Sequence, residues 1–217
     1  MAVSVQFFGA ASFLITTSTG KRVMIDPFLD SHVYSPVKVK DLDTVDLLLI
    51  THNAHDHFGD APSIISRFGC PVICAKDVMH NLIQYHGVDP DLFRVTIWGL
   101  LLEECGVRVR SIESHHWSFN VGAEGNLLSG PATGFIVEAD PGVRIYHPGD
   151  SALSYDMKLR GGVVQTECWP HACNNSGGRR DLLATHGMLQ DRRTDASRGA
   201  FGNPVAWAGA RYSQPFC

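Results

Sequence analysis

The sequence predicts a layered α/β domain that takes up the first 160 residues of the chain. Three observations predict it. Short runs with the two-residue alternation of β-strands open the chain, strand and helix patterns alternate after residue 45, and strand patterns with hairpin turns return after residue 90. Such strands bury their apolar faces by forming sheets that helices cover, so a purely helical fold is not expected.

The predicted elements follow one another in a simple order. An antiparallel meander of three strands opens the chain, at residues 3–8, 12–17 and 22–25. Residues 45–50 are apolar after Asp46, which suits a central strand buried on both faces. Helices are then predicted at residues 61–68 and 76–85, with a strand between them at residues 71–75. Further strands are predicted at residues 92–98, 107–112, 134–138 and 143–146.

Composition limits the classes of function. The chain has 217 residues, of which 44% are hydrophobic and 18% charged, and this balance is ordinary for a globular protein. A net charge of -4 does not indicate the basic surface that binds a polyanion, so we expect no nucleic acid partner. We expect a cytoplasmic protein outside any membrane, because the first residues lack the features of a signal peptide and no apolar run approaches about 20 residues. The six cysteines form no CxxC pair, which favours free thiols over disulfides.

Residues 51–60 hold three histidines and two aspartates directly after the predicted strand 45–50. The candidate metal ligands in this segment are His52, His55, Asp56 and His57. Imidazole nitrogens and carboxylate oxygens on a short loop at the end of a rigid strand are what a divalent metal centre requires. The alternative is a solvated polar loop, in which Asp60 is only the N-cap of the following helix.

Further candidate ligands follow other predicted strands. His115 and His116 come after strand 107–112, and Asp150 comes after strand 143–146. Loops at the strand ends of one sheet edge can converge in space, so we expect these side chains to approach the histidine cluster. Each of them taken alone is more often structural, and the prediction of a metal site depends on their combination.

With these residues the chain resembles the metallo-β-lactamase superfamily, in particular its branch of small metal-dependent hydrolases that includes L-ascorbate-6-phosphate lactonase. The matching segments are residues 8–9, 12–15, 24–29, 49–52, 56–57, 59–60, 134–138 and 145–151. The resemblance implies an αββα sandwich with the signature His-x-His-x-Asp-His, completed by a later His and a later Asp to give two adjacent metal sites. His52, Asp56 and His57 match the signature in register.

The resemblance also implies roles for residues outside the signature. Asp150 resembles the bridging aspartate, and either His116 or its neighbour His115 resembles the later ligand histidine. The histidine that does not bind is left in a supporting position. Asp26, followed by Pro27, resembles the family's carboxylate that orients a ligand imidazole, and the alternative is an ordinary Asp-Pro turn.

The signature departs from the family at one position. Its second histidine corresponds to Ala54, and His55 lies one place further on. Two roles stay open for His55, as a ligand on a rearranged loop or as a supporting residue of the pocket wall. The second role arises because a shift of one residue on an extended loop turns a side chain the other way.

The function implied by the resemblance is hydrolysis by a metal-activated water. A metal lowers the pKa of its water to about 7, and Asp56 is the candidate catalytic residue that orients this water or moves its proton. A site of His and Asp without cysteine suits one or two ions of Zn or Mn. We expect a small-molecule substrate with an ester, lactone or phosphoester bond, no organic cofactor, and a chain that acts alone or as a homo-oligomer. The alternative is a catalytically impaired metal-binding protein of the same fold, because of Ala54.

The chain changes character near residue 160. Val, Ile, Leu, Met and Phe number 55 in the first 160 residues and 9 in the last 57. The family continues after the bridging aspartate with a strand, a helix and a last ligand histidine, but neither His171 nor His186 follows an apolar strand. We therefore divide the chain into a hydrolase domain, 1–160, and an atypical tail, 161–217, which we interpret as a frame-shifted version of the closing part of the domain. The predicted sandwich is then incomplete after about residue 160, which is a second reason for the impaired alternative.

Overall fold

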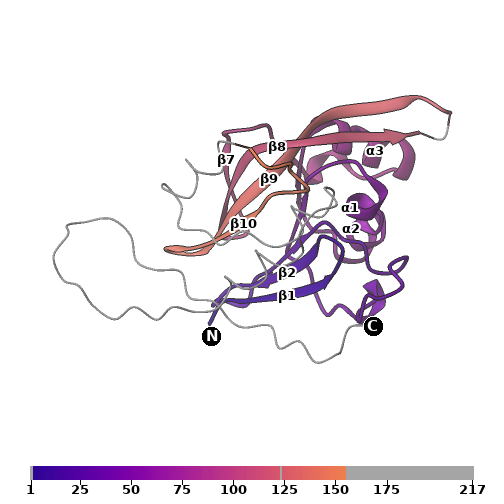
Figure 1. Cartoon of the computed structure of the whole chain (residues 1–217). Helices are drawn as coiled ribbons and strands as arrows, with labels where there is room; N and C mark the ends of the chain where they lie inside the picture. The colour runs from indigo at the N-terminus through magenta and orange to yellow at the C-terminus, as the bar shows by residue number, and fades with distance from the viewer. Residues whose placement is uncertain (1, 123, 155–217) are drawn as a thin grey trace, which may run out of the picture.

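Two β-sheets and a layer of helices make up the part of the chain that the structure, a computed structural model, describes: residues 2–122 and 124–154. Figure 1 shows the helices on one side of the first sheet and the second sheet on the other. The layered α/β fold is therefore confirmed. The predicted tail, 161–217, lies outside the described residues.

The first sheet has six strands in the order β1-β2-β3-β4-β5-β6. The strands are β1 (Ser4–Gly9), β2 (Ser12–Thr16), β3 (Arg22–Ile25), β4 (Leu47–Ile50), β5 (Val72–Cys74) and β6 (Phe93–Val95). The first three pair antiparallel, which confirms the predicted meander, and β3 to β6 pair parallel. Strand β4 lies inside the sheet with all four residues buried, as its unbroken apolar run predicts.

The second sheet is antiparallel, in the order β10-β9-β8-β7. Its strands are β7 (Leu101–Glu104), β8 (Val107–Val121), β9 (Leu127–Asp140) and β10 (Val143–His147). Strands β8 and β9 are much longer than the alternation in the sequence predicts, and they continue as a hairpin beyond the rest of the sheet (Figure 1). His115 and His116 therefore lie inside β8, which corrects the prediction that they follow the end of a strand.

Three helices connect the strands of the first sheet: α1 (His55–Phe58), α2 (Ala61–Phe68) and α3 (Lys76–His86). Two short 3-10 helices lie at Val39–Asp41 and Pro90–Leu92. Gly69 is the C-cap of α2 and Gly87 is the C-cap of α3. Both have the positive φ of a left-handed C-cap, which other residues adopt at a cost in free energy. No helix of the described ranges has the length and hydropathy that crossing a bilayer requires.

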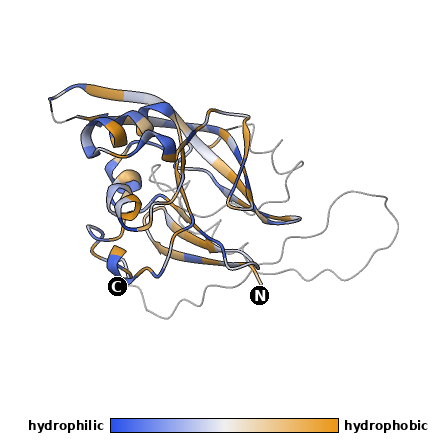
Figure 2. Cartoon of the chain, turned by 180° about the vertical axis from the view of Figure 1, so that it is seen from behind, coloured by the Kyte–Doolittle hydropathy of each residue, from blue (hydrophilic) through white to orange (hydrophobic). Residues whose placement is uncertain are grey.

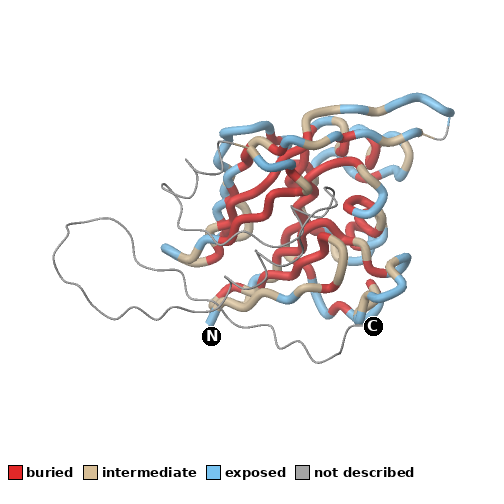
Figure 3. Tube along the Cα trace, viewed as in Figure 1, coloured by how far each residue is buried: buried red, intermediate tan, exposed pale blue. Residues whose placement is uncertain are grey.

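The core consists of two apolar layers, one on each face of the first sheet. The outer layer packs α2 and α3 on the sheet, with Ile64, Val78 and Leu82 against the side chains of β4 and β5. The inner layer fills the space between the sheets, where Leu49 and Phe135 belong to one buried cluster. Figure 2 shows apolar residues along both sheets, and Figure 3 shows buried stretches in both sheets. The sequence resemblance implies a second helical layer, which is not among the described residues.

Candidate metal centre

The ends of neighbouring strands bring the first site residues together. Strands β3 and β4 are parallel, and Ile25 pairs with Leu49. The residues that follow, Asp26 and Thr51, therefore leave the sheet at the same edge. The Asp26 amide donates a hydrogen bond to the Leu49 carbonyl at 3.0 Å, and the Thr51 amide donates to Asp26 Oδ1 at 2.8 Å. This edge of the sheet is where the histidine cluster begins.

Three side chains from distant parts of the chain meet at this edge. His52 follows β4, His116 comes from β8, and Asp150 follows β10. One ligand atom from each lies within 4.8 Å of the other two. Strand β8 shifts its register between Glu113 and Trp117, and such an irregularity re-aims the side chains on it. His52, His116 and Asp150 are therefore grouped closely enough to hold one metal ion.

His57 lies beside this group, held between two carboxylates. Its Nδ1 is 2.8 Å from Asp26 Oδ2, and its Nε2 is 3.1 Å from Asp150 Oδ2. Burial alone would lower the pKa of His57, but the charges of Asp26 and Asp150 and the hydrogen bonds to them raise it to about 10. Burial opposes the charge of Asp150 as well, yet the hydrogen bond to His57 lowers the pKa of Asp150 to about 2. The two carboxylates therefore favour the protonated form of His57, and its ring bridges them.

Thr51 sets the tautomer of His52. The Thr51 hydroxyl has one proton and donates it to Asp26 Oδ2 at 2.7 Å, because a carboxylate can only accept. Thr51 Oγ1 therefore accepts a hydrogen bond from His52 Nδ1 at 2.9 Å. The free electron pair of His52 then lies on Nε2. Burial and the charge of His57 lower the pKa of His52 to about 3, so this imidazole is neutral at pH 7.

The residues present fit a metal ion. His52 Nε2 is buried and has no hydrogen-bond partner among the described residues. A buried polar atom without a partner costs free energy unless something binds it. A neutral imidazole nitrogen, next to a second imidazole and a carboxylate, is a donor set typical of zinc and of other first-row divalent metals. Sequence reasoning missed Thr51, although a hydroxyl directly before the first histidine of the cluster was a signal.

The other predicted residues lie outside the group of His52, His116 and Asp150. Asp56 is exposed, and its Oδ2 is 3.9 Å from His57 Nε2. His55 is exposed at the start of α1 and meets the ring of Phe28 edge-on, with 5.5 Å between the ring centroids. His115 is exposed, and its Nε2 is 3.6 Å from Glu113 Oε1. Neither His55 nor His115 belongs to the group of three.

The segment at residues 55–58 is a helical turn and not the extended loop that we expected. Ala54, at the position of the missing histidine, is the N-cap of α1. Successive side chains on a helix are about 100° apart, so His55 and Asp56 leave the turn in different directions. The offset of one residue between Ala54 and His55 therefore turns the imidazole to a different direction. It does not turn it to the opposite side, as it would on an extended loop.

Two of the carboxylates occupy strained backbone positions. Asp26 has a φ of 47° and Asp150 a φ of 86°, in the left-handed region that residues other than glycine rarely adopt. Ser12 supports Asp26, because its hydroxyl donates to the Asp26 carbonyl at 2.6 Å and accepts from the Phe28 amide at 2.8 Å. Gly149 has a φ of 63°, and a Cβ there would lie 2.6 Å from Thr51 Cβ. The turn before Asp150 therefore requires glycine in order to pack on Thr51.

Comparison with known proteins identifies the family. The model of the β-lactamase superfamily domain matches residues 4–161. A UPF0173 metal-dependent hydrolase of Herpetosiphon aurantiacus is 31% identical over 163 residues, which are 75% of this chain and 67% of the relative. One of Thermococcus onnurineus is 35% identical over 157 residues, 72% of this chain and 65% of the relative. The chain thus spans less than two thirds of the length of that relative.

A solved structure gives the same fold. Igni18, described as a novel metallo hydrolase from the archaeon Ignicoccus hospitalis, superposes with a TM-score of 0.61 over 76% of this chain and 68% of its own. The two sequences are 24% identical, so this likeness supports the fold and carries no statement about substrate.

Proposed function

Because this chain belongs to the β-lactamase superfamily and, within it, to the UPF0173 metal-dependent hydrolase family, we propose that it is a metal-dependent hydrolase of small molecules. Its substrates carry an ester, lactone or phosphoester bond, with lactones included because of the resemblance to the lactonase branch. The observation that carries the proposal is the convergence of His52, His116 and Asp150 around the unpartnered, buried Nε2 of His52.

His52, His116 and Asp150 would hold the metal. When bound, a divalent ion supplies a water of lowered pKa and polarises the oxygen of the substrate. To bind the ion as well, His57 would have to give up its Nε2 proton, while Asp26 would keep the Nδ1 proton in place and fix the ring. Asp56 is exposed beside His57 and is placed to orient water or to carry its proton away. The donors are nitrogen and oxygen atoms only, which suits Zn or Mn, as one or two ions.

A catalytically impaired metal-binding protein of the same fold is the second candidate. Two observations favour it. The position of the second signature histidine is Ala54, and His55 lies outside the group of three. A site with fewer ligands holds its metal less tightly and positions water less well.

The three free thiols of the described residues, Cys70, Cys74 and Cys105, are compatible with the cytoplasm as the compartment for either function.

The test measures metal content and turnover on the same samples. The full chain is purified, dialysed and analysed for Zn and Mn, and its hydrolysis of bis(p-nitrophenyl) phosphate, p-nitrophenyl acetate and a simple lactone is recorded. We expect at least one bound ion per chain, turnover of one substrate class, and loss of both in His52→Ala and Asp150→Ala. His80→Ala is the matched control, because His80 is an exposed histidine on α3.

The outcomes separate the two candidates. Bound metal without turnover favours the impaired protein, and Ala54→His should then increase metal retention. Absence of bound metal after growth and dialysis with Zn or Mn, or equal metal content in Asp150→Ala and the wild type, refutes the metal centre itself.

A further inference from the structure

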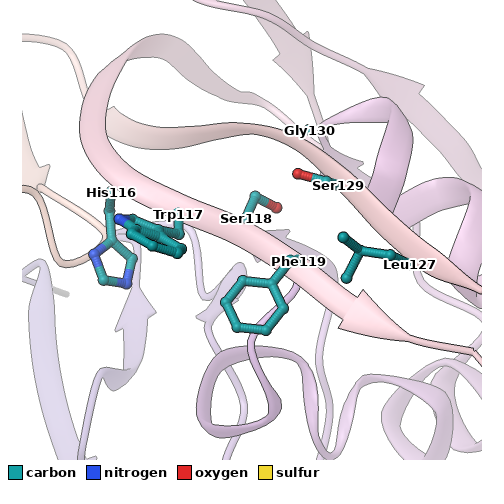
Figure 4. Close-up of a pocket in the computed structure, with 7 residues that line it drawn as sticks. All are labelled: His116, Trp117, Ser118, Phe119, Leu127, Ser129 and Gly130. Carbon is teal, nitrogen blue, oxygen red and sulfur yellow. The ribbon is translucent and has the colours of Figure 1, made fainter.

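A pocket of about 500 Å³ opens on the hairpin of β8 and β9, directly beside the metal centre. Figure 4 shows Trp117 and Phe119 from β8 and Leu127 from β9 along it, with His116 at one end. His116 therefore belongs both to this pocket and to the group that meets His52 and Asp150. Ligand pockets commonly have volumes of about 300–1,000 Å³ and apolar walls with a few polar groups.

The apolar side chains of this hairpin are exposed together. Trp117 is 75% exposed, Phe119 47% and Leu127 66%. The two aromatic rings lie 6.3 Å apart between centroids, so they form one continuous surface. Exposed apolar side chains that are contiguous in this way are a common mark of a binding site.

The hairpin is anchored to α3 through two of the residues that line the pocket, Ser118 and Gly130. The Ser118 side chain is buried, because strand alternation turns it away from the exposed Trp117 and Phe119. Ser118 donates a hydrogen bond to Asp77 Oδ2 and accepts one from the Asn53 amide at 3.1 Å. Gly130 packs so closely on Asp77 that a Cβ there would lie 2.5 Å from its carboxylate. The apolar face is therefore presented by a fixed element, attached to the same segment that carries His52.

The lining of the pocket decides the chemistry of its occupant. Among the described residues, its lining besides His116 consists of aromatic, aliphatic, serine and glycine residues, without Lys, Arg, Asp or Glu. An anionic group finds no cation among these residues, whereas an alkyl chain or an aromatic ring finds apolar contacts. Continuity with the metal centre through His116 favours the substrate as the occupant, with its reacting bond at the metal and its apolar part along the hairpin.

We infer that this hairpin is a specificity pocket for substrates with an apolar acyl or aryl group, placed between Trp117, Phe119 and Leu127. The inference deepens the proposed hydrolase function and rests on it. Apolar esters and lactones are then favoured over small polar substrates and over nucleotides. Trp117, Phe119 and Leu127 determine which substrates bind and take no part in the reaction itself.

The test is a chain-length series of ligands on the zinc-loaded full chain, measured by isothermal titration calorimetry. Acetohydroxamate, butyrohydroxamate and octanohydroxamate share a head that chelates the metal and differ only in their alkyl chain. We expect affinity to rise by up to about fourfold per added methylene in the wild type. In Phe119→Ser and Leu127→Ser this rise should shrink, while the affinity for acetohydroxamate stays unchanged.

Val121→Ser is the matched control. Val121 lies on the same strand as Phe119, opposite Leu127, and is 61% exposed, but it does not line the pocket. The variant should keep the full dependence on chain length. All these positions are exposed, so the substitutions leave the core intact.

Octanamide separates this inference from the proposed function, because it has the apolar chain without a chelating head. Octanamide binding that is lost in Phe119→Ser supports the pocket even if acetohydroxamate does not bind and the metal proposal fails. Acetohydroxamate binding without any gain from longer chains overturns the pocket and leaves the metal proposal standing. A wild-type dimer that Phe119→Ser dissociates, with no dependence on chain length, also overturns it, since the hairpin is then an interface between two copies.

Discussion

Replacing Thr51 with Val removes one hydroxyl from the metal centre and keeps the shape of the side chain. This hydroxyl connects Asp26 with His52, at 2.7 Å and 2.9 Å, and lies 3.4 Å from His57 Nδ1. All of these side chains are buried, so water does not replace the lost contacts. The substitution leaves the Nδ1 proton of His52 without an acceptor, and the imidazole is then free to change its tautomer.

The expected magnitude follows from the two shorter hydrogen bonds. A bond to a charged group contributes about 1.5–3 kcal/mol and one between neutral groups about 0.5–1.5 kcal/mol. Thr51→Val should therefore lower the free energy of unfolding by about 2–4.5 kcal/mol. Loss of a group that orients a ligand imidazole lowers metal affinity about 10-fold to 100-fold, and we expect this range for zinc.

Urea unfolding and competitive zinc titration with a chromophoric chelator measure the two effects. Thr96→Val is the matched control, because Thr96 is a buried threonine whose hydroxyl bonds to Ser111, away from the metal centre. This control should lose stability and keep the zinc affinity of the wild type. An unchanged zinc affinity in folded Thr51→Val would refute the claim that Thr51 orients His52.

Three further predictions concern Gly149, the buried thiols and His57. Gly149→Ala should lower both stability and metal content, because the new methyl group would lie 2.6 Å from Thr51 Cβ at a φ of 63°; normal metal content in this variant would contradict the packing argument. Burial raises the pKa of the Cys70 thiol to about 12 and that of Cys74 further still, so peptide mapping should find neither alkylated by iodoacetamide at pH 8 until the protein is unfolded. In metal-free protein the pKa of His57 is raised from 6.5 to about 10, so its contribution to stability is complete below pH 6.5 and is lost as pH rises toward 10. Urea unfolding at pH 6.5 and pH 10 in the presence of a chelator measures this loss. Equal free energies of unfolding at the two pH values would contradict the prediction.

The sequence predicts the first half of the fold well because each element there is short and regular. Helix α2 has the predicted bounds, and β4 is buried on both faces as its apolar run indicates. The lengths of β8 and β9 could not be predicted, since polar residues such as Ser114 and Ser118 interrupt the alternation. Both side chains are buried and donate hydrogen bonds, Ser114 to the Gly149 carbonyl and Ser118 to Asp77. These partners come close to the strand only in the folded chain.

The candidate site is predicted in its residue types and less well in its geometry. Crowding of His and Asp after a buried strand identifies His52 and its neighbours without any structure. The position of His116 depends on an irregularity inside β8, and that of His55 on a helical turn of four residues. A turn this short has no periodicity that a sequence can display. The support of Asp26 and Thr51 for the histidines needs two parallel strands in register, which is a property of the sheet.

X-ray absorption at the zinc edge, on zinc-loaded wild type and His116→Ala, tests the metal centre most directly. We expect a first shell of nitrogen and oxygen at about 2.0–2.1 Å, with imidazole scattering that is weaker in the variant. A shell that contains sulfur at about 2.3 Å, or identical spectra for the two proteins, would contradict it, because the ion would then be held by residues other than His52, His116 and Asp150.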